Sequence, residues 1–164
     1  MSFTFGTYGD WSKAGIALRG LSQDHRLAAF KAVVDKDGEM IRQKLVGHIS
    51  KQDLNWTPLA EKTVKNKGHN KVYIETGTLR NNIVARRIRA PLNGYSLYIG
   101  ANPWTRSAKG EKLSTIMIYL EYGTSTIPAR PLIRPTWEEV RKQVKDDMRN
   151  VIRGLIRGGV GGGK

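Results

Sequence analysis

Gly158 to Lys164 is the segment of this chain whose spacing most resembles a nucleotide-binding motif. It fits the pattern Gly-x-x-x-x-Gly-Lys, in which backbone amides and the lysine hold phosphate groups. A P-loop follows a strand, opens a helix and continues with Ser or Thr, whereas this segment follows a predicted helix and ends on Lys164. We therefore do not predict nucleotide binding here.

Histidines and paired acidic residues are the other groups that could act in catalysis or bind a metal. His25, His48 and His69 share no helical spacing, and no second ligand type accompanies any of them. The pairs Glu138-Glu139 and Asp146-Asp147 point in different directions around a predicted helix, which favours capping and surface charge over acid and base catalysis. We expect no enzyme activity, no catalytic residue, no metal and no cofactor.

A basic cluster lies on and just before a predicted strand, at Arg80, Arg86, Arg87 and Arg89. On a strand, Arg87 and Arg89 would share one face while Arg86 lies on the other. We interpret the cluster as a solvated sheet face or as a charged docking surface for an acidic neighbour. Contact with nucleic-acid phosphates is the alternative, and it predicts strong salt dependence.

The charge of the whole chain bears on the same question. The net charge is +14, and residues 1–40 contribute five basic and five acidic side chains, so the excess lies in residues 41–164. A polyanion or an acidic protein surface is a plausible neighbour for such a chain. There are no cysteines, and no apolar run approaches the roughly 20 residues of a membrane span, so we expect no disulfides and no membrane segment.

Apolar periodicity predicts two long helices. The first runs from Ser22 or Asp24 to about Gln52, after a short helix from Asp10 to Leu18. The second is capped by Thr136 with Glu139 in the capping-box spacing, and Gly158 and Gly159 stop it. We expect one domain over residues 1–157 and a flexible glycine-rich tail over 158–164.

Between these helices the sequence predicts a strand pair and several turns. Alternation indicates strands over 83–90 and 95–100, joined by a hairpin turn at 91–94. Residues 114–122 are ambiguous between helix and strand. Pro58, with Thr57 as its cap, indicates the start of a short helix. The predicted structural turn residues are Thr76, Gly77, Leu79 and Gly123.

The segment from Ile127 to Pro135, which we call the arm, is the strongest candidate for an assembly contact. Its three prolines fix their own φ and push the preceding residues toward extended geometry, so little conformational entropy would be lost on docking. Apolar residues clustered on an exposed loop also favour an intersubunit contact. The predicted interface residues are Ile127, Pro128, Arg130, Pro131, Leu132 and Ile133.

Two blocks of sequence together carry a family pattern. The first is Trp56-Thr-Pro-Leu59 with Thr63 and Lys67, followed by Tyr73-Ile-Glu-Thr-Gly-Thr-Leu-Arg80 with Asn82-Ile83. The second is Leu120-Glu-Tyr-Gly-Thr124 followed by Ile127-Pro-Ala-Arg-Pro-Leu-Ile-Arg-Pro135. In this order and spacing they resemble the tailed-bacteriophage virion morphogenesis proteins, the tail-completion and neck family, over residues 10–157.

The resemblance implies an α+β fold, in which a small antiparallel sheet packs with a long N-terminal helix and a long C-terminal helix. It implies a structural subunit without enzyme activity that forms a homo-oligomeric ring at the head-tail junction of a virion. Its partners would be other phage neck and tail proteins, with non-specific contact to packaged DNA and no membrane. The particle would be assembled in the host cell cytoplasm. Gly77, Leu79 and the arm occupy the positions of the family's turn glycine, helix-starting leucine and proline-rich arm.

Two other functions remain as alternatives. A basic nucleic-acid-binding module would explain the net charge directly, and it requires the basic residues to form one continuous face. A small enzyme is the least favoured, because it requires a deep polar pocket with converging titratable groups.

Overall fold

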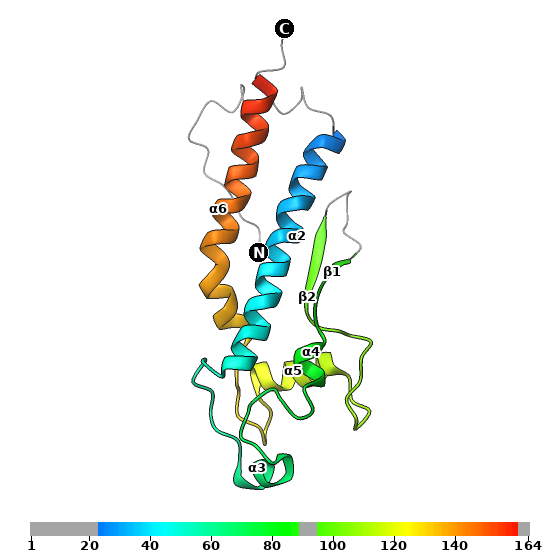
Figure 1. The fold of residues 1–164 in the computed structure, drawn as a ribbon, viewed down its shortest axis with the longest axis vertical. Helices are drawn as coiled ribbons and strands as arrows, with labels where there is room; N and C mark the ends of the chain where they lie inside the picture. The colour runs from blue at the N-terminus through cyan, green and yellow to red at the C-terminus, as the bar shows by residue number, and fades with distance from the viewer. Residues whose placement is uncertain (1–22, 89–94, 161–164) are drawn as a thin grey trace. The chain divides into compact units, whose positions relative to one another are not determined.

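The computed structural model describes residues 23–88 and 95–160, which form an α+β fold (Figure 1). The elements in chain order are α2 (Gln23–Lys51), α3 (Glu61–Lys67), α4 (Thr78–Asn81), β1 (Ile83–Ile88), β2 (Ser96–Ala101), α5 (Leu113–Tyr122) and α6 (Ile133–Val160). The predicted fold class, two long helices with a small antiparallel sheet, is confirmed. The short helix predicted over 10–18 and the turn at 91–94 lie outside the described residues.

The described residues fall into two compact units. The smaller contains residues 23–33 of α2 and 143–160 of α6, and Val33 and Leu155 are buried in it. The larger contains residues 34–142 and includes the sheet, the short helices and the arm. The single domain over residues 1–157 stays a prediction.

In the larger unit, α2 packs closely on the sheet at Gly38. Strands β1 and β2 are antiparallel, with Ala85 opposite Ile99. A Cβ atom at Gly38 would lie 2.4 Å from Cδ1 of Leu97 and 3.8 Å from Cδ1 of Ile99, so the absence of a side chain lets the helix approach the strand. The strand pairing that the sequence predicts is therefore held against α2 by apolar contact.

The core of the larger unit gathers the ends of α2, β1 and α5 around one cluster. Its buried members include Leu45 and Ile49 of α2, Leu113 and Met117 of α5, and Leu132 just before α6. Residues 114–122, which the sequence left ambiguous, lie in the helix α5, whose Leu113 and Met117 are four apart and face this core together.

The start of α6 differs from the prediction. The helix begins at Ile133, so Thr136 is not its N-cap; the Thr136 hydroxyl donates to the Leu132 carbonyl at 2.7 Å. Pro135 is tolerated because it lies in the first turn, where its missing N–H has no intrahelical acceptor. Glu139 does not complete a capping box either, because its carboxylate binds Lys44 and His48 of α2.

Two other helix boundaries also differ from the prediction. Helix α6 continues to Val160, so Gly158 and Gly159 do not stop it; a helical glycine costs only about 1 kcal/mol relative to Ala. Helix α3 begins at Glu61 instead of Pro58. The carbonyls of Thr57 and Pro58, which an earlier helix start would commit to intrahelical bonding, accept hydrogen bonds from Arg130. Residues 161–164 of the predicted tail lie outside the described part of the chain.

The turn at Gly77 generates a first prediction. Gly77 is the N-cap of α4 with φ of 81°, the left-handed region that the turn prediction requires. Gly77→Val should lower the free energy of unfolding by about 1–3 kcal/mol because a β-branched residue is strained there. Gly47→Ala in α2 is the matched control, since a Cβ there meets nothing within 4 Å, and it should raise stability by about 0.5–1 kcal/mol. Urea unfolding measures both, and equal stabilities for the two variants would contradict this account of the turn.

The ion pairs between α2 and α6 generate a second prediction. Lys44 first, and then His48, hold the pKa of Glu139 below its usual value of 4.5, while burial opposes them. A depressed carboxyl pKa contributes stability above the unfolded pKa and loses it as pH falls through the folded pKa. The Glu139 side chain is 43% exposed, so Glu139→Gln should cost only about 0.5–1 kcal/mol near pH 7.

Urea unfolding at a series of pH values measures this effect. The difference in unfolding free energy between the parent and Glu139→Gln should shrink toward zero as the pH falls below 4.5. A difference that stays constant down to about pH 3 would show that the carboxylate charge is not what joins these helices.

Candidate assembly interface

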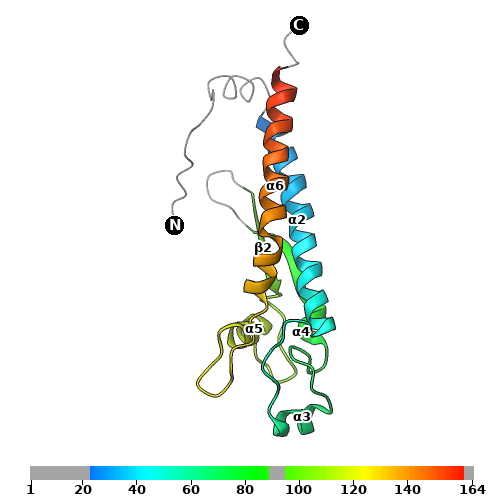
Figure 2. The ribbon, with the colours of Figure 1, turned by 90° about the vertical axis from the view of Figure 1, so that its left-hand side faces the viewer.

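The chain leaves α5 at Gly123, runs through a loop into the arm and enters α6 at Ile133 (Figure 2). Residues 127–131 have no helix or strand, and residues 133–135 form the first turn of α6. The extended geometry predicted for the whole arm is therefore wrong for 133–135. Each part of the arm is held by a specific contact.

The buried carboxylate of Glu121, at the end of α5, caps the N-terminus of α6. It accepts hydrogen bonds from the backbone N–H groups of Leu132 at 2.7 Å, Ile133 at 2.9 Å and Arg134 at 3.0 Å. The first N–H groups of a helix have no intrahelical acceptor, and the helix dipole places partial positive charge there. Pro135 has no N–H, and the Thr136 amide bonds to the Leu132 carbonyl, so one carboxylate completes this turn.

The middle of the arm is anchored by Arg130, whose side chain points inward. Its guanidinium donates to the carbonyls of Thr57 at 2.7 Å and Pro58 at 2.9 Å. The backbone N–H of Arg130 donates to the Leu120 carbonyl. Burial lowers the pKa of Arg130, but arginine stays protonated at any ordinary pH. The arm is thereby tied to the segment that precedes α3.

Two aromatic side chains donate hydrogen bonds to backbone carbonyls of the arm. The Tyr73 hydroxyl donates to the Arg130 carbonyl at 2.8 Å, and the Trp56 indole donates to the Pro131 carbonyl at 2.7 Å. Their rings are 5.0 Å apart. Burial first, and the Glu121 charge second, raise the pKa of Tyr73, so its hydroxyl remains a donor. Tyr73 has φ of 61°, a strained value that persists where the surroundings over-determine it. The two sequence blocks that carry the family resemblance thus meet in space.

Gly123 allows the arm to turn back on itself. Its φ is 77°, and a Cβ atom there would lie 2.9 Å from both the Ala129 nitrogen and the Ile127 oxygen. Backbone atoms cannot move aside as a side-chain end can, so only glycine fits without displacing the arm. The other predicted turn residues lie at α4, where the hydroxyls of Thr76 and Thr78 are 2.6 Å apart and Leu79 is buried.

The six predicted interface residues divide into two groups. Ile127, Pro128, Pro131 and Ile133 are exposed. Leu132 is 0% exposed and Arg130 is 4% exposed, so the expectation that these two form part of an exposed contact is wrong. Leu132 joins the apolar core, and Arg130 satisfies buried carbonyls. Whether the exposed four contact another subunit stays a prediction.

Sequence reasoning missed two large exposed side chains beside the arm. Tyr122 is 80% exposed and Trp137 is 44% exposed, and both line a groove with Ile133. Pro131 and Ala129 form part of the same wall. We call this surface the arm groove. Ile133 and Trp137 are four residues apart, so they share one helix face once the helix start is placed at Ile133. A start at Thr136 hid that spacing.

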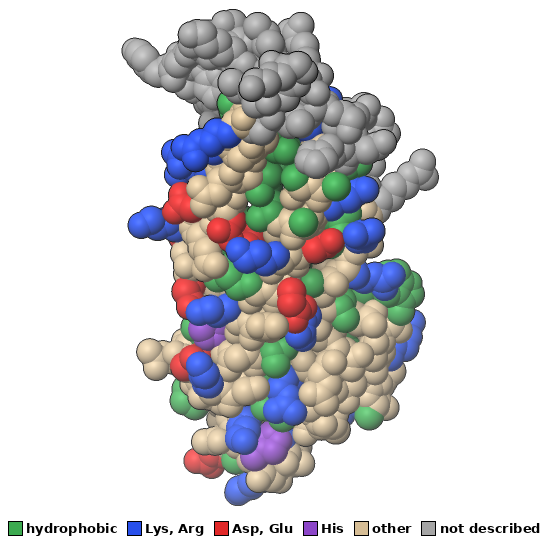
Figure 3. Space-filling view, turned by 45° about the horizontal axis from the view of Figure 1, so that its top comes forward, with side chains coloured by type: hydrophobic (Ala, Val, Ile, Leu, Met, Phe, Trp, Pro, Cys, Tyr) green, Lys and Arg blue, Asp and Glu red, His purple; other side chains and the backbone are tan. Residues whose placement is uncertain are grey.

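The predicted charged docking surface is partly neutralised within the chain. Arg87 pairs with Asp35 of α2 at 3.2 Å, and Arg86 lies over the ring of Trp104. Arg80 bonds to Asn81 at 3.2 Å, and Arg89 lies outside the described residues. On the face in Figure 3, basic side chains are interspersed with acidic ones and do not form a single patch.

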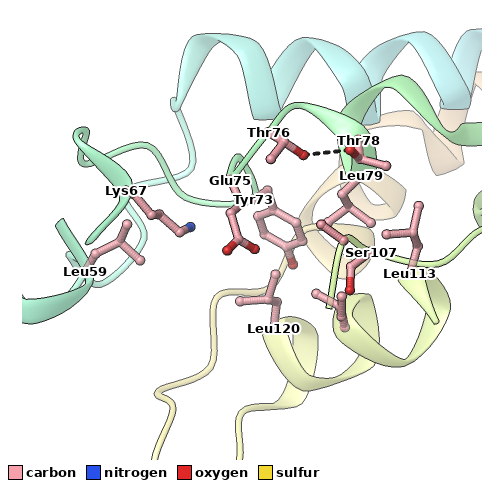
Figure 4. A pocket seen from close by; sticks show the side chains of 12 residues that line it. Leu59, Lys67, Tyr73, Glu75, Thr76, Thr78, Leu79, Ser107, Leu113 and Leu120 are labelled. Carbon is pink, nitrogen blue, oxygen red and sulfur yellow. Dashed lines mark hydrogen bonds between the residues drawn. The ribbon is translucent and has the colours of Figure 1, made fainter. Parts of the chain in front are cut away.

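A pocket in the larger unit bears on the enzyme alternative (Figure 4). It has a volume of about 120 Å³ and is lined mainly by apolar side chains, among them Leu79, Leu113 and Leu120. The Lys67 amine donates to the Ile74 carbonyl at 3.0 Å, and Glu75 pairs with Lys109. Burial lowers the pKa of Lys67, and the Glu75 charge opposes this. Both of these charged groups therefore have partners within the subunit.

The candidate metal ligands are used structurally in the described part of the chain. His48 lies between the carboxylates of Asp53 at 2.7 Å and Glu139 at 3.1 Å, and the His69 ring accepts from the Lys71 amide. Over residues 23–88 and 95–160, no group of three or more His, Asp or Glu side chains could hold a metal ion. The His25 side chain lies outside this description.

No protein-family model, curated protein or solved structure matches this chain. Within the described residues, no helix is long and apolar enough to cross a membrane.

The Glu121 cap generates the third prediction. Glu121→Gln keeps the size of the side chain but removes its charge and replaces one accepting oxygen with an NH2 group, which cannot accept from N–H. The variant should lose about 2–3 kcal/mol of unfolding free energy, because buried amides lose a charged acceptor. Glu138→Gln is the matched control on α6, since Glu138 is exposed and pairs with Arg141, which is exposed as well. It should cost under about 0.5 kcal/mol. Equal losses in urea unfolding would refute the cap.

Proposed function

We propose that this protein is a structural assembly subunit that associates with copies of itself through the arm groove and the exposed part of the arm. The observation that carries the proposal is the exposure of Tyr122, Ile133 and Trp137 around one groove on a braced segment. Clustered exposed apolar side chains of this kind favour a partner, and Trp and Tyr are the residues most enriched among interface hot spots.

The bracing of the arm supports assembly in a second way. The contacts made by Glu121, Arg130 and Trp56 order the arm within the subunit, so docking would cost little further conformational entropy. The arm groove and the exposed side chains of Ile127 and Pro128 lie on the same chain. Where two different surfaces of one subunit are complementary, copies make head-to-tail contacts, and these form a ring when the rotation between subunits closes.

The resemblance to tail-completion and neck proteins supports a finer proposal. We propose that the ring joins head and tail in a tailed-phage virion, assembles in the host cytoplasm and contacts other neck and tail proteins. Its contact with packaged DNA would be non-specific. Electron microscopy of the purified protein, alone and mixed with neck or tail components, tests this proposal. Rings that add to tails are expected, and a protein that binds none of these components would refute it.

A basic nucleic-acid-binding module is the second candidate, favoured by the net charge of +14. The effect of salt on binding distinguishes this candidate from self-association. Copies of one cationic subunit repel each other, so added salt should strengthen an apolar self-association by screening that repulsion. Salt weakens binding to nucleic acid, because counterions are no longer released so favourably.

The fourth prediction concerns self-association. Replacing Trp137 with Ser should weaken it by about 30-fold in Kd, or about 2 kcal/mol, if Trp137 is an interface hot spot. Trp104→Ser is the matched control, because Trp104 is 68% exposed on another segment, and it should assemble like the parent. Pro128→Gly with Pro131→Gly should also weaken assembly, since it loosens the arm and leaves the groove intact.

Sedimentation velocity over a range of protein and salt concentrations measures the self-association of the parent and of each variant. A parent protein that stays monomeric at high concentration and high salt would refute self-association. Equal assembly by parent and Trp137→Ser would remove the arm groove from the interface.

A further inference from the structure

Trp104 is held in the solvent by a rigid loop. Its side chain is 68% exposed, which is high for the largest apolar residue type. Its backbone N–H donates to the Asn102 side chain at 3.1 Å, and the next residue, Thr105, bonds to Asn82 through its hydroxyl at 3.3 Å. The Asn102 amide donates to the Asn82 carbonyl at 2.8 Å. Trp104 is thus fixed to the end of the sheet while its ring remains outside.

The indole ring has a cation on one face. The guanidinium carbon of Arg86 lies 4.1 Å from the ring centroid. Arg86 comes from β1 and is exposed, as is Ile88 two residues later on the same face of that strand. Since the ring is 68% exposed with one face covered, its other face is open to solvent. This arrangement presents a flat aromatic surface backed by positive charge.

The loop around Trp104 is basic. Segments 80–88 and 95–112 contain six Lys and Arg residues and one acidic residue, Glu111. Arg87 and Lys109 face the carboxylates of Asp35 and Glu75, which offset their charge. Arg106 instead donates to the neutral Gly110 carbonyl and lies opposite Lys112 across a β-bridge. Positive charge therefore remains on the same loop as the exposed ring.

We propose that Trp104 and Arg86 form a stacking platform for an unpaired base of single-stranded nucleic acid, with Arg106 and Lys112 contacting its phosphates. Proteins that bind single strands without sequence preference combine aromatic side chains, on which bases stack, with basic residues that follow the backbone. An acidic protein surface would be attracted by the charge but would gain little from an open indole face. A duplex keeps its bases stacked inside and offers only phosphates to this surface.

The test measures fluorescence anisotropy of a labelled oligothymidine of about 20 nucleotides, beside a duplex of equal length, at about 50 mM salt. The parent should bind the single strand more tightly than the duplex. Trp104→Ala should weaken single-strand binding by about tenfold and leave duplex binding unchanged. Trp104→Tyr, which restores an aromatic face, should recover most of the affinity. Tyr119→Ala is the matched control, because Tyr119 is an exposed aromatic residue outside both the arm groove and this loop, and it should bind like the parent.

Two further variants separate charge from stacking. Arg106→Gln with Lys112→Gln should reduce the slope of log Kd against log salt, whereas Trp104→Ala should leave that slope unchanged. An unaltered melting temperature checks that each variant is folded. The proposal is overturned if the parent does not bind the single strand, if Trp104→Ala binds it as the parent does, or if Tyr119→Ala loses as much affinity. Because Trp104 and Trp137 act in different assays, failure here leaves the self-association test standing.

Discussion

One buried carboxylate joins α5 to the start of α6 in the larger unit. Glu121 ends α5, and its oxygens complete the first turn of α6 by accepting the amides of Leu132, Ile133 and Arg134. Glu121 holds the C-terminal end of the arm, and the carbonyl of the neighbouring Leu120 accepts the backbone N–H of Arg130, so the end of α5 fixes the path of the chain into α6. The start of α6, the burial of Leu132 and the exposure of Ile133 all follow from the same cap. A helix that began three residues later would turn these side chains differently.

The interior contacts of the arm also explain its exterior. Arg130, Trp56 and Tyr73 use backbone carbonyls as their partners, so they satisfy the loop without covering its outer surface. The side chains left outside are mainly apolar or aromatic, as at Tyr122 and Trp137. A loop that is rigid without a partner and apolar on its outer side is suited to association. The basic surface around Trp104 lies on other residues, so protein contact and nucleic-acid contact are physically separate proposals.

Local patterns were sufficient for much of the fold. The apolar stripe of α2, the alternation of β1 and β2, and the positive φ of Gly77 were all predictable, because each depends on neighbours in sequence. The start of α6 was not, since Thr136 and Glu139 fit a capping box while a carboxylate from α5 took that role. Arg130 was expected in the exposed contact because it lies in the proline-rich arm. Its acceptors lie 73 and 72 residues away in the chain, and no local pattern points to them.

The central claim is that the arm is ordered within the single subunit, before any partner binds. Amide hydrogen exchange at high dilution tests it most directly, because the N–H groups of Leu132, Ile133 and Arg134 should be protected by Glu121 even when no subunits are in contact. We predict that they exchange as slowly as amides of the core helices at every protein concentration. Exchange at the rate of an unfolded peptide in dilute protein, slowing only as the protein is concentrated, would contradict the account.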